Sequence, residues 1–236
     1  MSKIALVIGA GPGLGAAVAR RFAREGFSVG VAARKRDTVD PTARSIVDAG
    51  GRAHAFTADT TDPAAVAALF TEVRAALGAP DVLVYNAGGF QMASILDASP
   101  DDFERAWKTS CFGAFLCARE ALPAMVERGA GTVLLTGATA AMRGGSKFSG
   151  FAVGKFGLRA LGQSMARELG PRGVHVAHII VDGQIDSPRA RTGSPDRDLS
   201  TFLAPDAIAE TYWQLHAQHA TAWTHEIDLR PASEKF

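Results

Sequence analysis

The first stretch of the sequence that could do chemistry is a glycine-rich loop near the N-terminus. A short apolar run leads into glycines at alternate positions and then into a helical pattern, in the order IALVIGAGPGLGAAVARRF. Because glycine has no side chain, such a loop lets backbone N–H groups at a helix N-terminus approach a pyrophosphate. We predict a dinucleotide site, although the same glycines would suit a purely structural turn. The expected cofactor contacts are Gly9, Gly11, Pro12, Gly13, Leu14 and Gly15.

A basic run after the second apolar run bears on which dinucleotide would bind. A cofactor with a free ribose 2′-hydroxyl would favour a carboxylate here, but the sequence has Arg34, Lys35 and Arg36. A guanidinium suits a 2′-phosphate through charge-assisted hydrogen bonds. The pattern therefore favours NADP(H) over NAD(H). The alternative is a solvated basic turn, since Asp37 follows closely.

Polar residues also follow the third and fourth apolar runs. Asp59 and Thr60 come after one run, and Asn86, Ala87 and Gly88 after the next. Open α/β sheets bind ligands outside the carboxyl ends of their strands. Each segment alone could be an ordinary turn, but together with the glycine loop they predict one cofactor cleft.

These residues need a parallel sheet to bring them together, and the sequence has the pattern for one. Short β-rich runs alternate with longer helical segments, which favours right-handed crossovers and a doubly wound parallel sheet with helices on both faces. The expected strands are 4–8, 29–33, 53–58, 82–85, 132–136 and 175–181. The expected helices are 13–25, 41–49, 63–77, 101–128, 150–169 and 205–217.

Composition limits the class of protein. A chain of 236 residues that is 47% hydrophobic can build one sizeable core, so we expect a single domain over 1–236. Its net charge of +1 gives no reason to expect nucleic acid or an anionic membrane as a partner. Cys111 and Cys117, six apart on one expected helix, are too far apart for a disulfide, which fits a reducing cytoplasm. The N-terminal apolar run predicts a first strand rather than a signal sequence.

One long segment departs from the strand–helix alternation. Residues 186–204, DSPRARTGSPDRDLSTFLA, are rich in proline, arginine, serine and aspartate and lack sustained periodicity. Long loops without regular structure are often functional. We expect a flap on the substrate side of the site, with a plain surface connection as the alternative.

The chain resembles the short-chain dehydrogenase/reductase family over essentially its whole length. The matches are Gly9, Gly13 and Gly15 to its Gly-x-x-x-Gly-x-Gly loop, Asn86, Ala87 and Gly88 to its Asn-Ala-Gly motif, Asp59 to the aspartate near the adenine, and 182–187 to its Pro-Gly-x-Ile-x-Thr stretch. In that stretch Ile185 is kept and the proline has become Asp182. The resemblance implies a single Rossmann-like domain with about seven parallel strands, the seventh within 223–229. It also implies a homodimer or homotetramer assembled through the long helices.

The resemblance further implies a catalytic set of Asn, Ser, Tyr and Lys, most of which this sequence lacks. Ser110 stands at the asparagine position, Ala138 at the serine position and Phe151 at the tyrosine position. Lys155 is retained, and in the family this lysine lowers the tyrosine pKa and holds the nicotinamide ribose. Phenylalanine has no ionisable proton, so the family mechanism cannot run unchanged. Because positions four apart share a helix face, Phe151 and Lys155 should point into the same cleft.

Another proton donor would therefore have to come from nearby. Asp182 is one candidate, since a carboxyl in an apolar cleft can have a raised pKa, with a turn aspartate facing water as the alternative. Thr139 and Ser146 are hydroxyls on the expected substrate side, although both could be ordinary loop residues. Lys155 could itself donate, most plausibly through water, and would otherwise serve as the ribose anchor. A possible apolar pocket wall consists of Phe90, Met142, Phe148 and Phe151, which could equally be core residues.

Three functions remain open at this level. The first is an NADP(H)-dependent oxidoreductase of the carbonyl reductase or alcohol dehydrogenase type, acting on a small, mostly apolar substrate. The second is a non-catalytic NADP(H)-binding sensor or subunit. The third and weaker one is an isomerase or lyase that uses the same pocket. No metal site is expected, because the pairs His216/His219 and His175/His178 lack a third ligand at suitable spacing.

Overall fold

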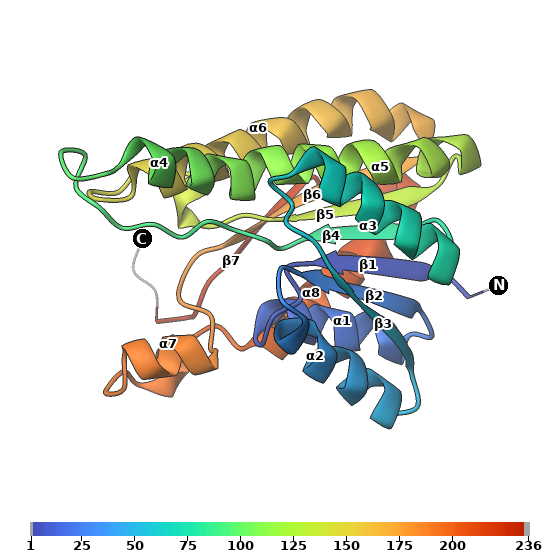
Figure 1. The fold of residues 1–236 in the computed structure, drawn as a ribbon, viewed down its shortest axis with the longest axis horizontal. Coiled ribbons are helices and arrows are strands. Elements are labelled where there is room, and N and C mark those ends of the chain that lie inside the picture. The colour runs from blue at the N-terminus through green and yellow to red at the C-terminus, as the bar shows by residue number, and fades with distance from the viewer. Residues whose placement is uncertain (1, 234–236) are drawn as a thin grey trace.

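The computed structural model describes residues 2–233, and their strands form one seven-stranded parallel sheet (Figure 1). The strands are β1 (Ile4–Ile8), β2 (Ser28–Ala33), β3 (Arg52–Thr57), β4 (Val82–Tyr85), β5 (Gly131–Thr136), β6 (Val174–Val181) and β7 (Glu226–Leu229). Their order across the sheet is β3-β2-β1-β4-β5-β6-β7. The predicted doubly wound sheet of about seven strands is therefore confirmed. Strand order reverses direction between β1 and β4, which is where such sheets bind ligands.

Helices cover both faces of this sheet. They are α1 (Leu14–Arg24), α2 (Arg36–Asp48), α3 (Pro63–Ala76), α4 (Pro100–Trp107), α5 (Gly113–Arg128), α6 (Ser149–Leu169), α7 (Pro188–Gly193) and α8 (Pro205–His216). In Figure 1, α1, α2 and α8 lie on one face and α3, α4, α5 and α6 on the other.

The central strand shows why the sequence forms two cores. All five residues of β1 are buried, and successive side chains of a strand point to opposite faces. Ala5 and Val7 accordingly pack into the core under α1 and α8, while Leu6 and Ile8 pack into the core under α3, α5 and α6. A strand buried on both faces reads as a continuous apolar run, which is why it could be recognised in the sequence.

The predicted single helix 101–128 is wrong in one respect. A π-helical turn, Lys108–Phe112, separates α4 from α5. The Tyr85 hydroxyl donates a hydrogen bond of 2.6 Å to the Thr109 carbonyl and so supplies a partner from outside the helix. A glycine follows at position 113, where a Cβ would lie 2.8 Å from a backbone oxygen of the loop after β3. Such π-turns are frequent at functional sites.

Two other predicted boundaries also need correction. Helix α2 begins at Arg36 rather than at Pro41, and its first turn contains an Arg36–Asp40 ion pair of 3.2 Å. The segment 186–204 is not irregular throughout, because it contains α7 and a 3₁₀ turn at Leu199–Thr201. Ser187 caps α7 by accepting a 3.1 Å hydrogen bond from the Ala190 N–H. A capping serine followed by proline is a helix-start signal, so this helix could have been recognised.

Candidate active site

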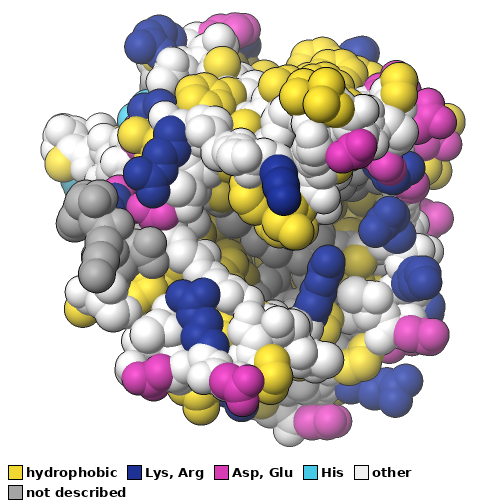
Figure 2. Space-filling model, turned by 90° about the vertical axis from the view of Figure 1, so that its left-hand side faces the viewer, with side chains coloured by type: hydrophobic (Ala, Val, Ile, Leu, Met, Phe, Trp, Pro, Cys, Tyr) yellow, Lys and Arg dark blue, Asp and Glu magenta, His cyan; other side chains and the backbone are white. Residues whose placement is uncertain are grey.

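A cavity of about 910 Å³ lies at the carboxyl ends of β1, β4, β5 and β6. It opens on the face shown in Figure 2, where the hollow is surrounded by basic and hydrophobic side chains. The predicted cofactor residues that line it are Gly9, Gly11, Pro12, Gly13, Leu14, Gly15, Asn86, Gly88, Lys155 and Ile185. The fold thus brings most of the predicted site into one cavity.

The glycine loop packs directly against the end of β4. Gly9 has a φ of 83°, in the left-handed region, and a Cβ there would lie 2.6 Å from the Ala87 backbone nitrogen. The Asn86 side-chain amide donates a 2.9 Å hydrogen bond to the Gly9 carbonyl. The loop after β1 and the loop after β4 therefore hold each other in place.

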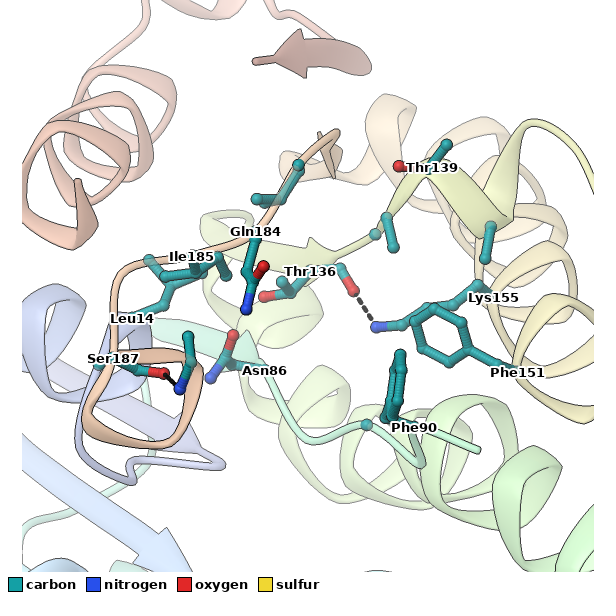
Figure 3. Close-up of a pocket in the computed structure, with 18 of the residues that line it drawn as sticks. Leu14, Asn86, Phe90, Thr136, Thr139, Phe151, Lys155, Gln184, Ile185 and Ser187 are labelled. Atoms are coloured by element: carbon teal, nitrogen blue, oxygen red, sulfur yellow. Dashed lines mark hydrogen bonds between the residues drawn. The ribbon is translucent and has the colours of Figure 1, made fainter. Parts of the chain in front are cut away.

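The segment after β6 lies on the other side of the glycine loop. Gly13 has a φ of 117°, and the space that a Cβ would take there is 3.4 Å from the Ser187 Cβ. Ile185, Ser187 and Ala190 line the cavity beside the loop (Figure 3). Any ligand extended along the glycine loop would therefore contact the start of α7.

The two basic residues predicted to select the cofactor lie outside the cavity lining. Arg34 and Lys35 are exposed between β2 and α2, and neither side chain forms a hydrogen bond or close ion pair within residues 2–233. Arg36 beside them is engaged, because its guanidinium donates a 2.9 Å hydrogen bond to the Ala55 carbonyl. Arg34 and Lys35 are thus available to a ligand that extends beyond the glycine loop.

Three further predicted cofactor residues also lie outside the cavity lining. Asp59 accepts hydrogen bonds from the Thr61 N–H and hydroxyl at 2.9 and 2.8 Å. Those bonds, with a smaller contribution from the Arg34 charge, lower its pKa. Thr60 is buried, with its hydroxyl 3.1 Å from that of Tyr85. Ala87 packs against the core under α3 and α5. The sequence pattern predicted their position at strand ends but could not show these local contacts.

Lys155 is a buried cation on the floor of the cavity. It comes from α6 and is 4% exposed, and its Nζ donates a 2.7 Å hydrogen bond to the Thr136 carbonyl at the end of β5 (Figure 3). Its Nζ lies 5.9 Å from the centre of the Phe151 ring. Removal from water lowers its pKa from 10.5 to about 8, because burial disfavours the charged amine. Lys155 is therefore still largely protonated at neutral pH but can release a proton readily.

The other three positions of the implied catalytic set offer no ionisable group. Phe151 packs against Phe90, with ring centres 5.4 Å apart, and both line the cavity together with Ala138. Ser110 does not reach the cavity. It is fully buried in the π-helical turn, where its hydroxyl accepts a 3.1 Å hydrogen bond from the Gly89 N–H.

Asp182 is held away from the cavity. Its carboxylate accepts a hydrogen bond from the Thr139 hydroxyl and lies 3.5 Å from the Arg230 guanidinium. Thr139 itself lines the cavity, but its proton is directed at Asp182. Neither Asp182 nor Ser146 is part of the cavity lining.

Several lining residues were not foreseen as site residues. Phe148 and Phe90 form part of the wall as expected, whereas Met142 does not. The additional polar and charged ones are Thr136, Arg143, Gln184, Ser187, Arg189 and Ser194, of which the last three belong to the predicted flap. Most of them belong to the segment after β6, whose proximity to the cavity follows from the sheet order. Arg143 carries no motif that would have marked it in the sequence.

The histidines form a structural network rather than a metal site. His175 and His178 lie inside β6, and His178 Nδ1 is 3.0 Å from Glu226. Glu226 also accepts two 2.7 Å hydrogen bonds from Arg159 of α6. Across residues 2–233, no group of three or more His, Cys, Asp or Glu side chains is placed to hold a metal ion. The same residues include no helix long and apolar enough to span a membrane.

The fold and the cavity define a Rossmann-like α/β protein with its site at the switch point of the sheet. Residues 3–197 match the family model described as short chain dehydrogenase. The chain is also 32% identical to a sorbitol-6-phosphate 2-dehydrogenase of Escherichia coli over 90% of this chain and 83% of that protein. The chain therefore belongs to the short-chain dehydrogenase family of oxidoreductases.

Solved structures agree with this assignment. A short-chain dehydrogenase from Rhodopseudomonas palustris superimposes with a TM-score of 0.84 at 38% identity, covering 98% of each chain. A metagenomic short-chain oxidoreductase in complex with NADP gives a TM-score of 0.85 at 28% identity, covering 98% of this chain and 99% of the other.

Proposed function

We propose that this chain is an NADP(H)-dependent oxidoreductase that interconverts a carbonyl group and an alcohol on a small, largely apolar substrate. The observation that carries the proposal is Lys155, a buried cation that faces the cavity between the glycine loop and the aromatic wall. A buried charge without a nearby carboxylate is costly, so a role in ligand binding or catalysis accounts for its presence.

The cavity fits a dinucleotide. The backbone of the loop from Gly9 to Gly15 has no room for side chains at its contact with β4, and it leads into the N-terminus of α1. Backbone N–H groups at a helix N-terminus suit a pyrophosphate. Asn86, Gly88 and Ile185 continue the lining toward Lys155, which would hold the nicotinamide ribose.

Arg34 and Lys35 support NADP(H) over NAD(H). Both are exposed at the end of β2, and neither side chain has a hydrogen-bond partner in the described part of the chain. The 2′-phosphate of NADP(H) would accept charge-assisted hydrogen bonds from these side chains. A similar short-chain oxidoreductase was solved in complex with NADP, which is consistent with this preference.

Lys155 is our proposed source of the proton in carbonyl reduction. When bound, the reduced nicotinamide supplies a hydride to the carbonyl carbon. One ammonium proton of Lys155 is used by the Thr136 carbonyl, and another is available to the substrate oxygen, directly or through one water. The neutral amine then regains its proton from solvent. The rings of Phe90 and Phe151 would exclude water from the carbonyl.

The pH dependence of turnover tests this role. Because the Lys155 pKa is about 8, kcat for carbonyl reduction should fall as the pH rises above that value. The variant Lys155→Arg keeps a positive charge but cannot release its proton in this range. It should bind NADPH and reduce the carbonyl at least about 10²-fold more slowly. A rate in Lys155→Arg equal to that of the wild type would contradict the proposal.

A non-catalytic NADP(H)-binding protein is the second candidate. It is favoured by the use of Ser110 to hold the Gly89 N–H and by the absence of a donor at Ala138 and Phe151. Replacement of all three groups is the expected outcome if they no longer share a catalytic role. Tight NADPH binding without carbonyl reduction would favour this function.

We also propose that 1–236 form one domain that works in the cytoplasm as a homodimer or homotetramer. Apolar side chains on the long helices support assembly there, since Phe115 of α5 is 40% exposed and Phe156 of α6 is 42% exposed. Residues 186–204 would act as a flap, because Ser187 and Ala190 line the cavity beside the glycine loop. Light scattering at several protein concentrations tests the assembly.

A further inference from the structure

The charges that line the cavity are all positive. Its lining contains Arg143, Lys155 and Arg189 but, among the described residues, no aspartate or glutamate. We propose that the substrate carries an anionic group, a carboxylate or a phosphate monoester, which Arg143 binds at the cavity mouth. Arg189 adds to the positive potential at that mouth. This proposal rests on the carbonyl chemistry proposed above and specifies its substrate class.

Arg143 belongs to the substrate end of the cavity. It follows the 3₁₀ turn Thr139–Ala141 after β5, and its N–H donates a 3.2 Å hydrogen bond to the Thr139 carbonyl. Ala138, which stands at the serine position of the implied catalytic set, belongs to the same loop. Arg143 therefore lines the cavity from the same loop as Ala138 and Thr139.

The loop that carries Arg143 packs against the aromatic wall of the cavity. In Figure 3, Phe90 and Phe151 lie at one side of the cavity and Leu14 and Ser187 at the other. Phe148 shares the aromatic side, since its ring centre lies 5.8 Å from that of Phe90. The Phe148 ring also lies 3.2 Å from the space that a Cβ at Gly145 would take, two residues after Arg143. The loop that carries Arg143 therefore packs on the aromatic side of the cavity, opposite Leu14 of the glycine loop.

The side chains of Arg143 and Arg189 have no partner among the described residues. Neither guanidinium takes part in a hydrogen bond, an ion pair or a ring contact there. On the same flap, Arg191 forms an ion pair of 2.6 Å with Asp186, and Arg197 donates a 2.8 Å hydrogen bond to Gln184. Both guanidinium groups that line the cavity are thus left without a compensating carboxylate among the described residues.

The surface view agrees with this distribution. Figure 2 shows basic side chains above and below the hollow, with hydrophobic ones next to it, whereas acidic side chains lie further out. A guanidinium binds a carboxylate or phosphate through paired hydrogen bonds. The site is therefore suited to a substrate with an apolar body, a carbonyl group near Lys155 and an anionic group at Arg143.

Matched pairs of aldehydes test the proposal. Each pair has the same apolar body with and without a negative charge: 4-carboxybenzaldehyde against methyl 4-formylbenzoate, and 4-formylphenyl phosphate against 4-methoxybenzaldehyde. NADPH oxidation gives kcat/KM for each aldehyde, and calorimetric titration into the NADP⁺-loaded chain gives its dissociation constant. The variants are Arg143→Gln and Arg189→Gln. Lys147→Gln is the control, because it removes one positive charge from the same loop at a residue that does not line the cavity.

We expect at least one anionic aldehyde to be preferred over its neutral partner by about 10- to 100-fold, as charge-assisted hydrogen bonds of ordinary strength would give. Arg143→Gln should abolish most of that preference by lowering kcat/KM for the anionic aldehydes. Arg189→Gln should reduce it less, and Lys147→Gln should have no effect. The carboxylate and phosphate pairs distinguish which anion is bound.

Failure of this inference can be distinguished from failure of the proposed carbonyl chemistry. Reduction of neutral and anionic aldehydes at equal rates would overturn the anionic substrate and leave the chemistry intact. The opposite result is that no aldehyde is reduced but the anionic ones bind more tightly in a way that depends on Arg143. That result would overturn the carbonyl chemistry and support the anionic site. Equal affinity within each pair, or no measurable affinity for any of the four, would overturn the anionic site.

Discussion

Lys155 and Phe151 lie one helical turn apart on α6, with the Lys155 ammonium 5.9 Å from the centre of the Phe151 ring. Both side chains face the cavity. A hydroxyl added to that ring would face the same cavity as the ammonium, and the positive charge would lower the pKa of that hydroxyl. The site thus retains the geometry for a phenolic acid while lacking the phenol.

Phe151→Tyr should increase carbonyl reduction. A positioned general acid typically contributes about 10²–10⁴ in rate, and Lys155 already supplies a slower route in our account. We therefore expect kcat for an aldehyde to rise at least about 10-fold, with little change in NADPH affinity. Steady-state NADPH oxidation at saturating aldehyde measures this.

The matched control is Phe148→Tyr. Phe148 belongs to the same aromatic wall, in contact with Phe90, but it does not share the four-residue spacing with Lys155. A gain in Phe151→Tyr alone would show that the position matters. Equal gains in both variants, or none in either, would count against a productive geometry at position 151.

Gly9→Ala should destabilise the chain much more than Gly50→Ala. The two glycines have nearly equal φ values, 83° and 82°, but a Cβ at position 9 would lie 2.6 Å from Ala87 nitrogen, whereas at position 50 nothing lies within 4 Å. The left-handed conformation costs about 1–2 kcal/mol in both. The overlap at position 9 should add about 1–3 kcal/mol. Urea unfolding measures the free energy of unfolding of each variant. An equal decrease in both would show that the loop after β4 shifts at little cost to accommodate the added Cβ.

Arg34→Gln combined with Lys35→Gln should weaken NADPH binding about 10- to 100-fold and leave NADH binding nearly unchanged. The reason is that the two residues would lose charge-assisted hydrogen bonds to the 2′-phosphate alone. Arg36→Gln is the control, since Arg36 is engaged with Asp40 and the Ala55 carbonyl. Fluorescence titration gives both dissociation constants. An equal loss of affinity for NADPH and NADH would show that Arg34 and Lys35 do not bind the 2′-phosphate.

Lys155→Met should stabilise the cofactor-free chain at neutral pH. The Lys155 pKa is lowered from 10.5 to about 8, so the unfolded chain binds this proton more tightly than the folded chain does. The resulting destabilisation is present in full below pH 8 and disappears as the pH rises toward 10.5. It amounts to at most about 3 kcal/mol. The stability of Lys155→Met should exceed that of the wild type at pH 7 and approach it at pH 10. A stability advantage that does not change with pH would contradict this cause.

Much of the fold could be predicted from the sequence because its signals are local. The strands are continuous apolar runs such as β1, whose side chains face both cores, and such runs identify strands of a parallel sheet. The division of the helix at 101–128 could not be predicted, because its cause is the Tyr85 hydroxyl, which reaches Thr109 from a distant strand.

The candidate site was predictable to the extent that it follows from strand ends. The glycine loop, Asn86 and Lys155 lie together because parallel strands end at one edge of the sheet. The direction of individual side chains was not predictable. Asp182 is drawn to Thr139 and Arg230, and Arg143 enters the cavity from a loop whose sequence carries no motif.

The most direct test of the account is NADPH consumption by the purified chain with a panel of aldehydes and ketones that includes the anionic ones above, beside Lys155→Ala. We expect the wild type to oxidise NADPH only when a carbonyl compound is present, with stoichiometric formation of the alcohol, and Lys155→Ala to be at least about 10²-fold slower. Tight NADPH binding without alcohol formation from any member of the panel would contradict the account. It would favour a protein whose function is to bind the cofactor.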